Sequence, residues 1–321
     1  MNKFYYKRIF VTIVLLLGLN LIYSQNSFYS NDGLGKNYFG SSARMEGLGY
    51  SGSAIYDSLS VTSFNPALWH SFRTVSLQGK LDFSQMNSQK IKDNHRTAGL
   101  GGFSAKMPLG NYSGVAFGIK PSYRVNTETE ITKALPGDTV QYTNKEIISG
   151  GISEFFVGGG YRLTRRLSAG MVVKFLFGKY SANLKTTNLN SRSYYYDREK
   201  NIEGTQLGGG LYWNVPENYS ISLYYERNLN FKFNQIIQYY NGNPDTTDYR
   251  SLDYPSNIRI GARKYISSDF VLTADAAITQ YPQALAEFNP LVNGNYSDSY
   301  LLGVGLEKQP SQEYRPGFFK S

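Results

Sequence analysis

Few side chains in this sequence are suited to covalent catalysis. The chain has no Cys and only two His residues, His70 and His95, which stand alone beside predicted strand ends. A Ser-His-Asp triad needs a His held between a nucleophile and an acid, and neither position offers that arrangement. The Gly runs at 99–102 and 158–160 lack the Lys-Ser/Thr of a phosphate-binding loop. We therefore expect no enzymatic activity, no cofactor and no metal site.

Non-covalent binding of a hydrophobic ligand is better supported. An apolar patch with a nearby cation holds such a molecule by its body and its acidic headgroup. The candidate ligand-binding residues share one predicted face of the strands: Lys120, Arg124, Lys174, Val172, Leu176 and Tyr224. The alternative is that the cations pair with acids on the same face, such as Asp82, Glu226 and Asp275, and hold the wall in register.

Strands are the elements that must position these residues. From Phe72 onward apolar and polar residues alternate with a period of two, which separates them onto the two faces of a strand. In 220–234 the apolar face carries Ile221, Leu223, Tyr225, Leu229, Phe231 and Phe233. In 115–125 it carries Val115, Phe117, Ile119, Tyr123 and Val125. Lys232 falls on the opposite, polar face, as Lys120 and Arg124 do.

The composition agrees with a wall that faces lipid on one side only. Mean hydropathy is −0.39, which would ordinarily indicate a soluble protein. A membrane β-barrel also has a low mean, because lipid-facing and lumen-facing residues alternate. Aromatic residues make up 15%, and the 32 Gly are scattered through strand-like segments. We predict an all-β, antiparallel transmembrane β-barrel, in contact with outer membrane lipid.

The charge pattern argues against a nucleic-acid partner. The 33 Lys and Arg residues outnumber the 24 Asp and Glu residues, which gives a formal net charge of +9. These basic residues are spread through strands and turns and form no patch on a recognisable nucleic-acid fold. We expect an ordinary solvated surface and no binding of nucleic acid.

The connections between strands predict an orientation. Tight turns are expected at 108–111, 164–166, 215–218, 265–269 and 308–313. They alternate with longer polar loops at 87–94, 133–138, 188–193, 241–248 and 282–297. In an up-and-down barrel of the outer membrane, the tight turns face the periplasm and the longer loops face the exterior.

The N-terminus has the order of a secretory signal peptide. Lys3, Lys7 and Arg8 precede an apolar run at 9–22, and a polar exit follows at 23–25. The run is shorter than the roughly 20 apolar residues of a spanning helix. We expect cleavage near Ser24 and an exported protein of the outer membrane.

The strand count predicts an unfinished barrel. The alternating segments give about eleven strands, the last beginning near Tyr314. Single-chain bacterial barrels have an even number of strands, and an open edge in lipid costs several kcal/mol per unpaired group. We expect the last strands to be missing. The alternative is that one strand is miscounted and the barrel closes with fewer.

A Gly- and Ser-rich segment at 25–70 separates the signal peptide from the wall. It has no amphipathic period. Its candidate hatch residues are Gly40, Arg44, Gly47, Gly49, Asn65, Pro66 and Ala67. Asn-Pro is also a common turn starter, so the second group could simply lead the chain into the first strand.

These motifs resemble the N-terminal region of the FadL/TodX (OMPP1) family of long-chain fatty-acid transporters. Residues 40–49 are similar to its Gly-Ala-Arg run, and 64–67 to its Trp-Asn-Pro-Ala run, with Phe64 in place of Trp. The resemblance implies a fourteen-stranded barrel with an N-terminal plug that moves to let hydrophobic molecules pass. Together with the signal-peptide and strand patterns, it divides the chain into a signal peptide at 1–24, a hatch at 25–70 and a barrel at 71–321 that is expected to be truncated.

Two functions remain open from the sequence. The first is an outer membrane channel for passive uptake of hydrophobic small molecules, with fatty acids as the class that the resemblance implies. The second is a barrel that transports nothing and partners a type IX-like secretion machinery, as a relative of the same fold does. A continuous apolar tunnel favours the first, and a sealed lumen with large apolar outer loops favours the second.

Overall fold

The structure is a computed structural model. It describes residues 34–38, 42–56, 61, 64–88, 93–134, 141–188, 193–215, 218–239, 244–267, 269–283 and 297–308. The short elements at the N-terminal side are β1 (Lys36–Asn37), α2 (Ala43–Gly47) and η2 (Pro66–Ser71). The longer strands are β2 (Ser76–Ser88), β3 (Asp93–Pro108), β4 (Ser113–Ala134), β5 (Gln141–Arg162), β6 (Leu167–Asn188), β7 (Ser193–Val215), β8 (Tyr219–Tyr239), β9 (Asp245–Ser251), β10 (Ser256–Tyr265), β11 (Phe270–Gln280) and β12 (Ser299–Lys308).

The strands form one antiparallel sheet of twelve strands. Its path runs β12-β11-β10-β8-β7-β6-β5-β4-β3-β2, so neighbours in the chain are neighbours in the sheet. β9 and β10 both pair with β8, at successive stretches, and act as one interrupted wall strand. The prediction of an all-β antiparallel barrel wall is confirmed. The strand expected from Tyr314 lies outside the described residues, as do the signal peptide and Gly40.

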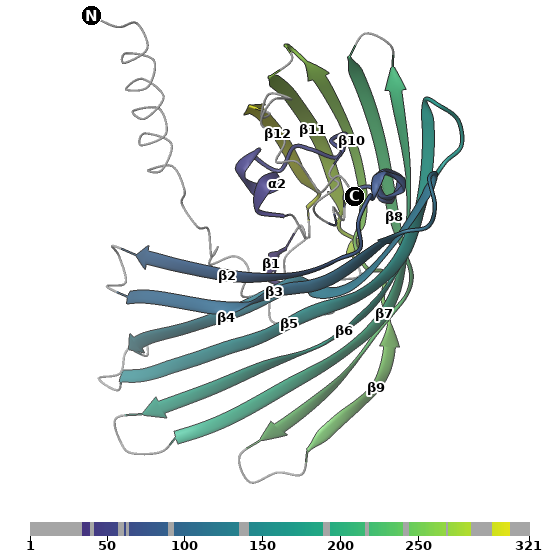
Figure 1. The fold of residues 1–321 in the computed structure, drawn as a ribbon. Helices are drawn as coiled ribbons and strands as arrows, with labels where there is room; N and C mark the ends of the chain where they lie inside the picture. Colours follow the sequence, from purple (N-terminus) through teal and green to yellow (C-terminus); the bar gives the residue numbers. More distant parts are fainter. Residues whose placement is uncertain are drawn as a thin grey trace, which may run out of the picture.

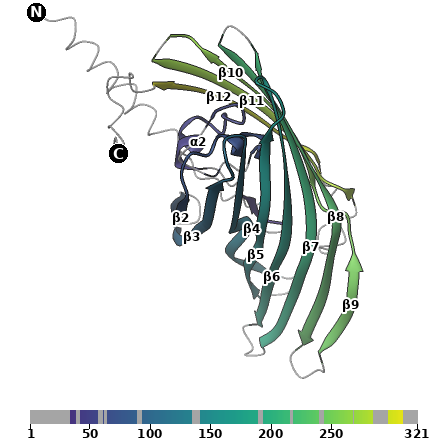
Figure 2. The ribbon, with the colours of Figure 1, turned by 45° about the vertical axis from the view of Figure 1, so that its right-hand side comes forward.

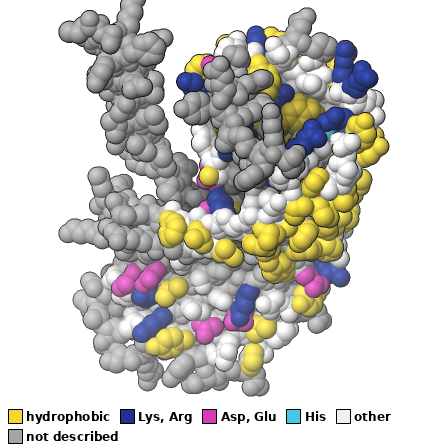
Figure 3. Space-filling view, viewed as in Figure 1, with side chains coloured by type: hydrophobic (Ala, Val, Ile, Leu, Met, Phe, Trp, Pro, Cys, Tyr) yellow, Lys and Arg dark blue, Asp and Glu magenta, His cyan; other side chains and the backbone are white. Residues whose placement is uncertain are grey.

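The outer face of the sheet is apolar. Side chains such as Phe83, Leu302 and Val304 are 70–84% exposed, and Figure 3 shows the apolar side chains gathered in a band across the sheet. An exposed apolar surface of this extent needs a lipid environment. Because apolar and polar side chains alternate along each strand, only one face of the sheet has this apolar surface. No helix among the described residues is long and apolar enough to cross a membrane.

The predicted tight turns join successive strands of the sheet. Tight turns join β3 to β4, β5 to β6, β7 to β8 and β10 to β11, and lie at one end of the sheet (Figure 1). At the other end, β4 to β8 each run for 21–23 residues. Residues at the edges of the predicted loops, such as 133–134 and 245–248, belong to strands, because continued pairing satisfies their backbone N–H and C=O groups. Most of the other residues of these loops lie outside the described ranges.

Two β-bulges turn four aromatic or apolar side chains inward, and this corrects the sequence-based faces. The β4–β5 register shifts between Pro121 and Tyr123, and the β7–β8 register shifts opposite Leu229. One extra residue reverses the alternation that follows it. The side chains predicted to face lipid but found buried are Tyr123, Val125, Phe231 and Phe233. Lys232 lies between the last two and takes the opposite face.

The N-terminal segment lies inside the curve of the sheet (Figures 1 and 2). α2 begins at Ser42, whose side chain accepts a hydrogen bond from the Met45 N–H, and the chain leaves it through Gly49 in the left-handed region. Met45, Leu48, Ile55 and Phe64 then form an apolar cluster. This segment, residues 42–72 where described, is called the plug below.

Candidate functional site in the plugged lumen

A row of four glycines on the lumen face receives η2. Gly114, Gly160, Gly170 and Gly210 come from β4, β5, β6 and β7 and pair in register with one another. A Cβ atom on any of them would overlap the plug backbone or the Asn65 side chain. Gly160, the last of the Gly run at 158–160, thus lets the plug backbone pack closely against β5. Four adjacent strands leave a seat that only glycine provides.

Asn65 fixes η2 on this seat. Its side-chain oxygen accepts a hydrogen bond from the Ala67 N–H at 2.9 Å, which caps η2, and Pro66 follows at the first helical position. Its side-chain nitrogen donates to the Leu211 carbonyl of the wall at 2.9 Å. The Asn-Pro-Ala motif therefore does more than start a turn: Asn65, Pro66 and Ala67 are buried in the lumen.

The plug also spans the two ends of the described sheet. Arg44 donates two hydrogen bonds of 2.7 Å to the Glu307 carboxylate on β12. Two residues further along α2, Glu46 forms an ion pair with Lys80 on β2, with 2.5 Å between the carboxylate oxygen and the Lys80 nitrogen. Gly49 approaches the backbone of β12 closely, whereas Gly47 has open space beside it. The plug thus links β12 and β2, which do not pair with each other in the described ranges.

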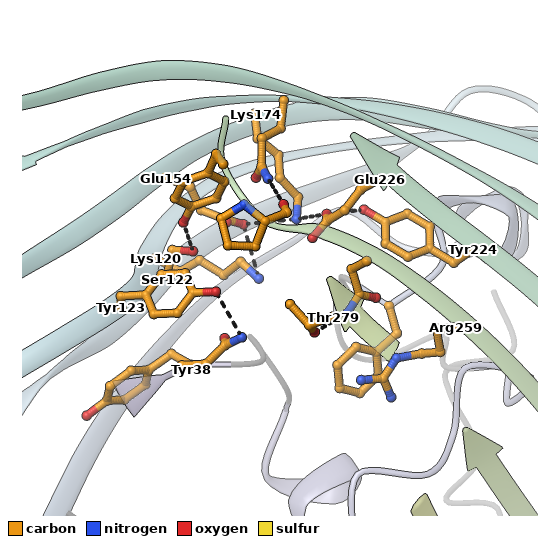
Figure 4. Close-up of a pocket in the computed structure, with 16 residues that line it drawn as sticks. Tyr38, Lys120, Ser122, Tyr123, Glu154, Lys174, Tyr224, Glu226, Arg259 and Thr279 are labelled. Atoms are coloured by element: carbon orange, nitrogen blue, oxygen red, sulfur yellow. Dashed lines mark hydrogen bonds and ion pairs between the residues drawn. The ribbon is translucent and has the colours of Figure 1, made fainter. Parts of the chain in front are cut away.

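An ion-paired network occupies the middle of the lumen (Figure 4). Lys174 contacts Glu226 at 2.5 Å and Glu154 at 3.7 Å, and Lys120 contacts Glu154 at 3.2 Å. The Tyr224 hydroxyl donates to Glu226 at 2.7 Å. Two cations thus face two carboxylates, so the network is neutral and geometry supports the wall-holding alternative for Lys120 and Lys174.

A second buried pair ties the plug to β10 and β11. Arg259 donates to Asp275 at 3.3 Å and to the Tyr50 carbonyl at 3.0 Å. Its guanidinium lies 4.1 Å from the centroid of the Phe64 ring. Asp275 also accepts the Ser53 N–H at 3.1 Å. A buried charge pair completed by plug groups stabilises the plug in its seat, since removing it would leave polar atoms unsatisfied.

The six candidate ligand residues fall into different surroundings. Lys120, Lys174 and Tyr224 line a polar cavity of about 60 Å³. Val172 packs with Trp69 and Phe156 around η2. Arg124 points elsewhere, donates to the Leu100 carbonyl at 2.6 Å and lies over the Tyr38 ring, because the bulge before it changes its face.

Leu176 belongs to an apolar cluster in the half of the lumen toward the longer loops. The cluster contains eleven wall side chains, Tyr123, Val125, Ile148, Ile152, Leu176, Tyr180, Ile202, Phe231, Phe233, Leu252 and Tyr254, together with Leu34. Leu34 is 3% exposed, and its carbonyl accepts a hydrogen bond from Tyr180 at 2.5 Å. The sequence-based faces placed Tyr123, Val125, Phe231 and Phe233 of this cluster toward lipid, because each follows a bulge.

The wall separates beside this cluster. β3 and β4 pair only from Phe103–Ile119 to Pro108–Gly114, although β4 continues to Ala134. Beyond that point the neighbour of β4 is β1, through Asn37 opposite Tyr123, and the Tyr38 N–H donates to the Ser122 carbonyl at 2.8 Å. A cavity of about 80 Å³ lies at this separation, lined in part by Phe103, Ile119 and Phe156.

Comparison with known proteins identifies the family. A family model described as BamG matches residues 5–320, nearly the whole chain. The chain belongs to the BamG family. The similarity of its N-terminal motifs to the FadL/TodX family thus stays a resemblance and does not show membership in that family. No curated protein matches the chain.

Two solved structures are similar to the BamG-family chain in outline. The CymD monoaromatic hydrocarbon channel shares 12% identity at a TM-score of 0.47, over 85% of this chain and 88% of that one. The Pseudomonas putida toluene transporter TodX shares 12% identity at a TM-score of 0.44, over 84% and 88%. At these scores the likenesses carry no argument about what this chain binds.

Proposed function

We propose that this BamG-family chain is an outer membrane channel for passive uptake of hydrophobic small molecules, with long-chain fatty acids as the first class to test. The observation that carries the proposal is the buried position of Leu34. A segment ahead of the plug places one aliphatic side chain among eleven apolar wall residues of the lumen. An apolar lumen site of this kind suits the tail of a hydrophobic ligand.

The mechanism follows from what Leu34 is attached to. It lies two residues before β1, and β1 takes the place of β3 beside β4. A ligand that displaces Leu34 would pull β1 from the β4 edge and widen the separation between β3 and β4. Binding and opening would then be one movement. The proposal includes export through a cleaved signal peptide and no catalytic step.

The test is uptake of labelled fatty acids by the full-length protein in liposomes, with two opposed variants. Leu34→Ala leaves space in the apolar cluster, so fatty-acid binding should strengthen and uptake should rise. Phe231→Ala removes a wall contact for the ligand, so fatty-acid binding should weaken and uptake should fall. Leu77→Ala is the matched control, because Leu77 is 70% exposed on the outer face. Equal uptake by all four proteins would overturn the assigned site.

A second function is favoured by the paired charges. Lys120 and Lys174 already face Glu154 and Glu226, and the cavity between them is only about 60 Å³. A lumen sealed in this way suits a barrel that serves as a subunit of a type IX-like secretion machinery and transports nothing. Absence of binding and uptake across all chain lengths would favour this function over the channel.

A further inference from the structure

A cavity near the tight-turn end is lined by arginine. Its volume is about 430 Å³, and its lining residues are Tyr56, Ser71, Arg73, Arg162, Arg165, Arg166, Ser168 and Asn214. Four are Arg, and none of these described lining residues is Asp or Glu. The balanced charges of the central network have no counterpart here.

The cavity lies at the mouth of the lumen, beneath the plug. Arg165 and Arg166 form the turn between β5 and β6, and Arg162 ends β5 on the face of the lumen-facing Gly160. Arg73 follows η2 by two residues. The plug thus supplies one side of the cavity and the wall supplies the other.

Its floor consists of buried hydroxyl groups. Ser71 and Ser168 are 8% and 2% exposed. Ser71 donates to the Leu68 carbonyl at 2.7 Å, and the Ser168 hydroxyl lies 3.4 Å from His70 Nε2. Each hydroxyl oxygen keeps acceptor or donor capacity toward the cavity.

The four guanidinium groups have no carboxylate partner within the described part of the chain. No ion pair involves them there, and the one ring contact is Arg162 over Tyr112 at 6.0 Å. Like charges gathered at one mouth repel one another unless an anion lies between them. A guanidinium offers paired donors that match the oxygens of phosphate.

We propose that this Arg-lined cavity binds a phosphate group, carried either by an anionic phospholipid headgroup or by a soluble phosphate compound. A phosphate presents more acceptor oxygens and more negative charge than a single carboxylate, so it is better suited to bridge several guanidinium groups at once. The bound group would bridge Arg73 of the plug side to Arg162, Arg165 and Arg166 of the wall. It would therefore hold the plug in its seat. This inference does not depend on the channel function.

The experiment measures binding of phosphate-containing probes to the full-length protein, held in detergent in a phosphate-free buffer at low salt. One arm titrates pyrophosphate, and the other titrates short-chain phosphatidylglycerol, with zwitterionic phosphatidylcholine as the reference of zero net charge. Arg165→Gln/Arg166→Gln should weaken binding about tenfold or more, because two charged hydrogen-bonding groups are lost. Arg250→Gln/Lys185→Gln is the control, since it removes the same charge from exposed strand positions near the other end.

Each outcome decides the proposal. Variant-sensitive binding in both arms supports a phosphate site, and binding of phosphatidylglycerol alone identifies the lipid headgroup as the source. Equal affinity of the wild type and the double variant overturns the site. An acidic peptide that binds when neither phosphate probe does would overturn the phosphate assignment in favour of a protein partner.

Discussion

At the scale of single residues, the plug depends on polar atoms that have no other partner when buried. Asn65 is 0% exposed and makes hydrogen bonds both within η2 and to the wall. Loss of a buried hydrogen-bonding group costs more than the bond itself, because the partner left behind is desolvated. Most of the free-energy cost of unseating the plug should therefore come from a few buried polar side chains such as Asn65.

Asn65→Ala should loosen the plug without unfolding the wall. The free energy of seating should fall by about 1–3 kcal/mol, since the Leu211 carbonyl and the Ala67 N–H both lose a partner. Trp69, buried within η2, reports this through its fluorescence in a Trp213→Phe background. Asn111→Ala, in the exposed turn between β3 and β4, is the control and should leave the signal unchanged.

His70 should make seating sensitive to acid. Burial lowers the pKa of His70 below its ordinary value of 6.5; the Ala67 carbonyl hydrogen bond partly opposes this, and Arg162 and Arg73 lower it further. The unseated form then takes up a proton at a pH where the seated form stays neutral, so seating weakens as pH falls below about 6.5. Trp69 fluorescence against pH measures it. In His70→Gln this dependence should vanish; its persistence would exclude His70.

At the scale of the elements, the glycine row shows how strands recognise a plug. Gly209 and Gly210 are adjacent on β7 and point to opposite faces, with Gly210 under Asn65 and Gly209 exposed on the outer face. The same substitution can therefore be tested on both faces of one strand. This pair separates an effect on the plug from an effect on the strand.

Gly210→Val should unseat the plug and raise single-channel conductance in planar bilayers, because its side chain would overlap Asn65. Gly209→Val should insert as well as the wild type and conduct no more than it does. If both variants conduct alike, η2 does not close the lumen at this seat.

The sequence predicted the strands well and their faces only in part. Met171, Phe175 and Phe177 are exposed and Val172, Lys174 and Leu176 are buried, as simple alternation requires. The alternation fails after each bulge, since one extra residue has no signature in the period itself. Glu154, the acid between Lys120 and Lys174, escaped notice because its Gly-rich segment fits either register.

At the scale of the whole molecule, α2 joins the two ends of the described sheet. Arg44 reaches Glu307 on β12, and Glu46 reaches Lys80 on β2. The side chains of Arg44 and Glu307 are 29% and 22% exposed, so solvent screens their attraction. An exposed ion pair of this kind fixes the position of α2 between β12 and β2 and adds little to the stability of the fold.

Reversing the pair tests this link. Arg44→Glu should destabilise the folded protein by about 1 kcal/mol, as two carboxylates would then face each other. Arg44→Glu/Glu307→Arg should recover most of the loss. Urea unfolding, followed by mobility on unheated gels, measures both. A double variant no better than the single one would show that the contact does not hold the two ends together.

The seat of the plug has a consequence for the order of assembly. Asn65 is made early in the chain, yet its wall partner Leu211 lies 146 residues later, and the seat needs β4 to β7 already paired. Contacts this distant form late in folding. A slip of one residue in β4 or β6 would turn Gly114 or Gly170 toward lipid and place the side chain of a neighbouring residue under η2. The plug precedes the wall in the chain, yet it docks only after β4 to β7 have paired in the register that brings their four glycines together.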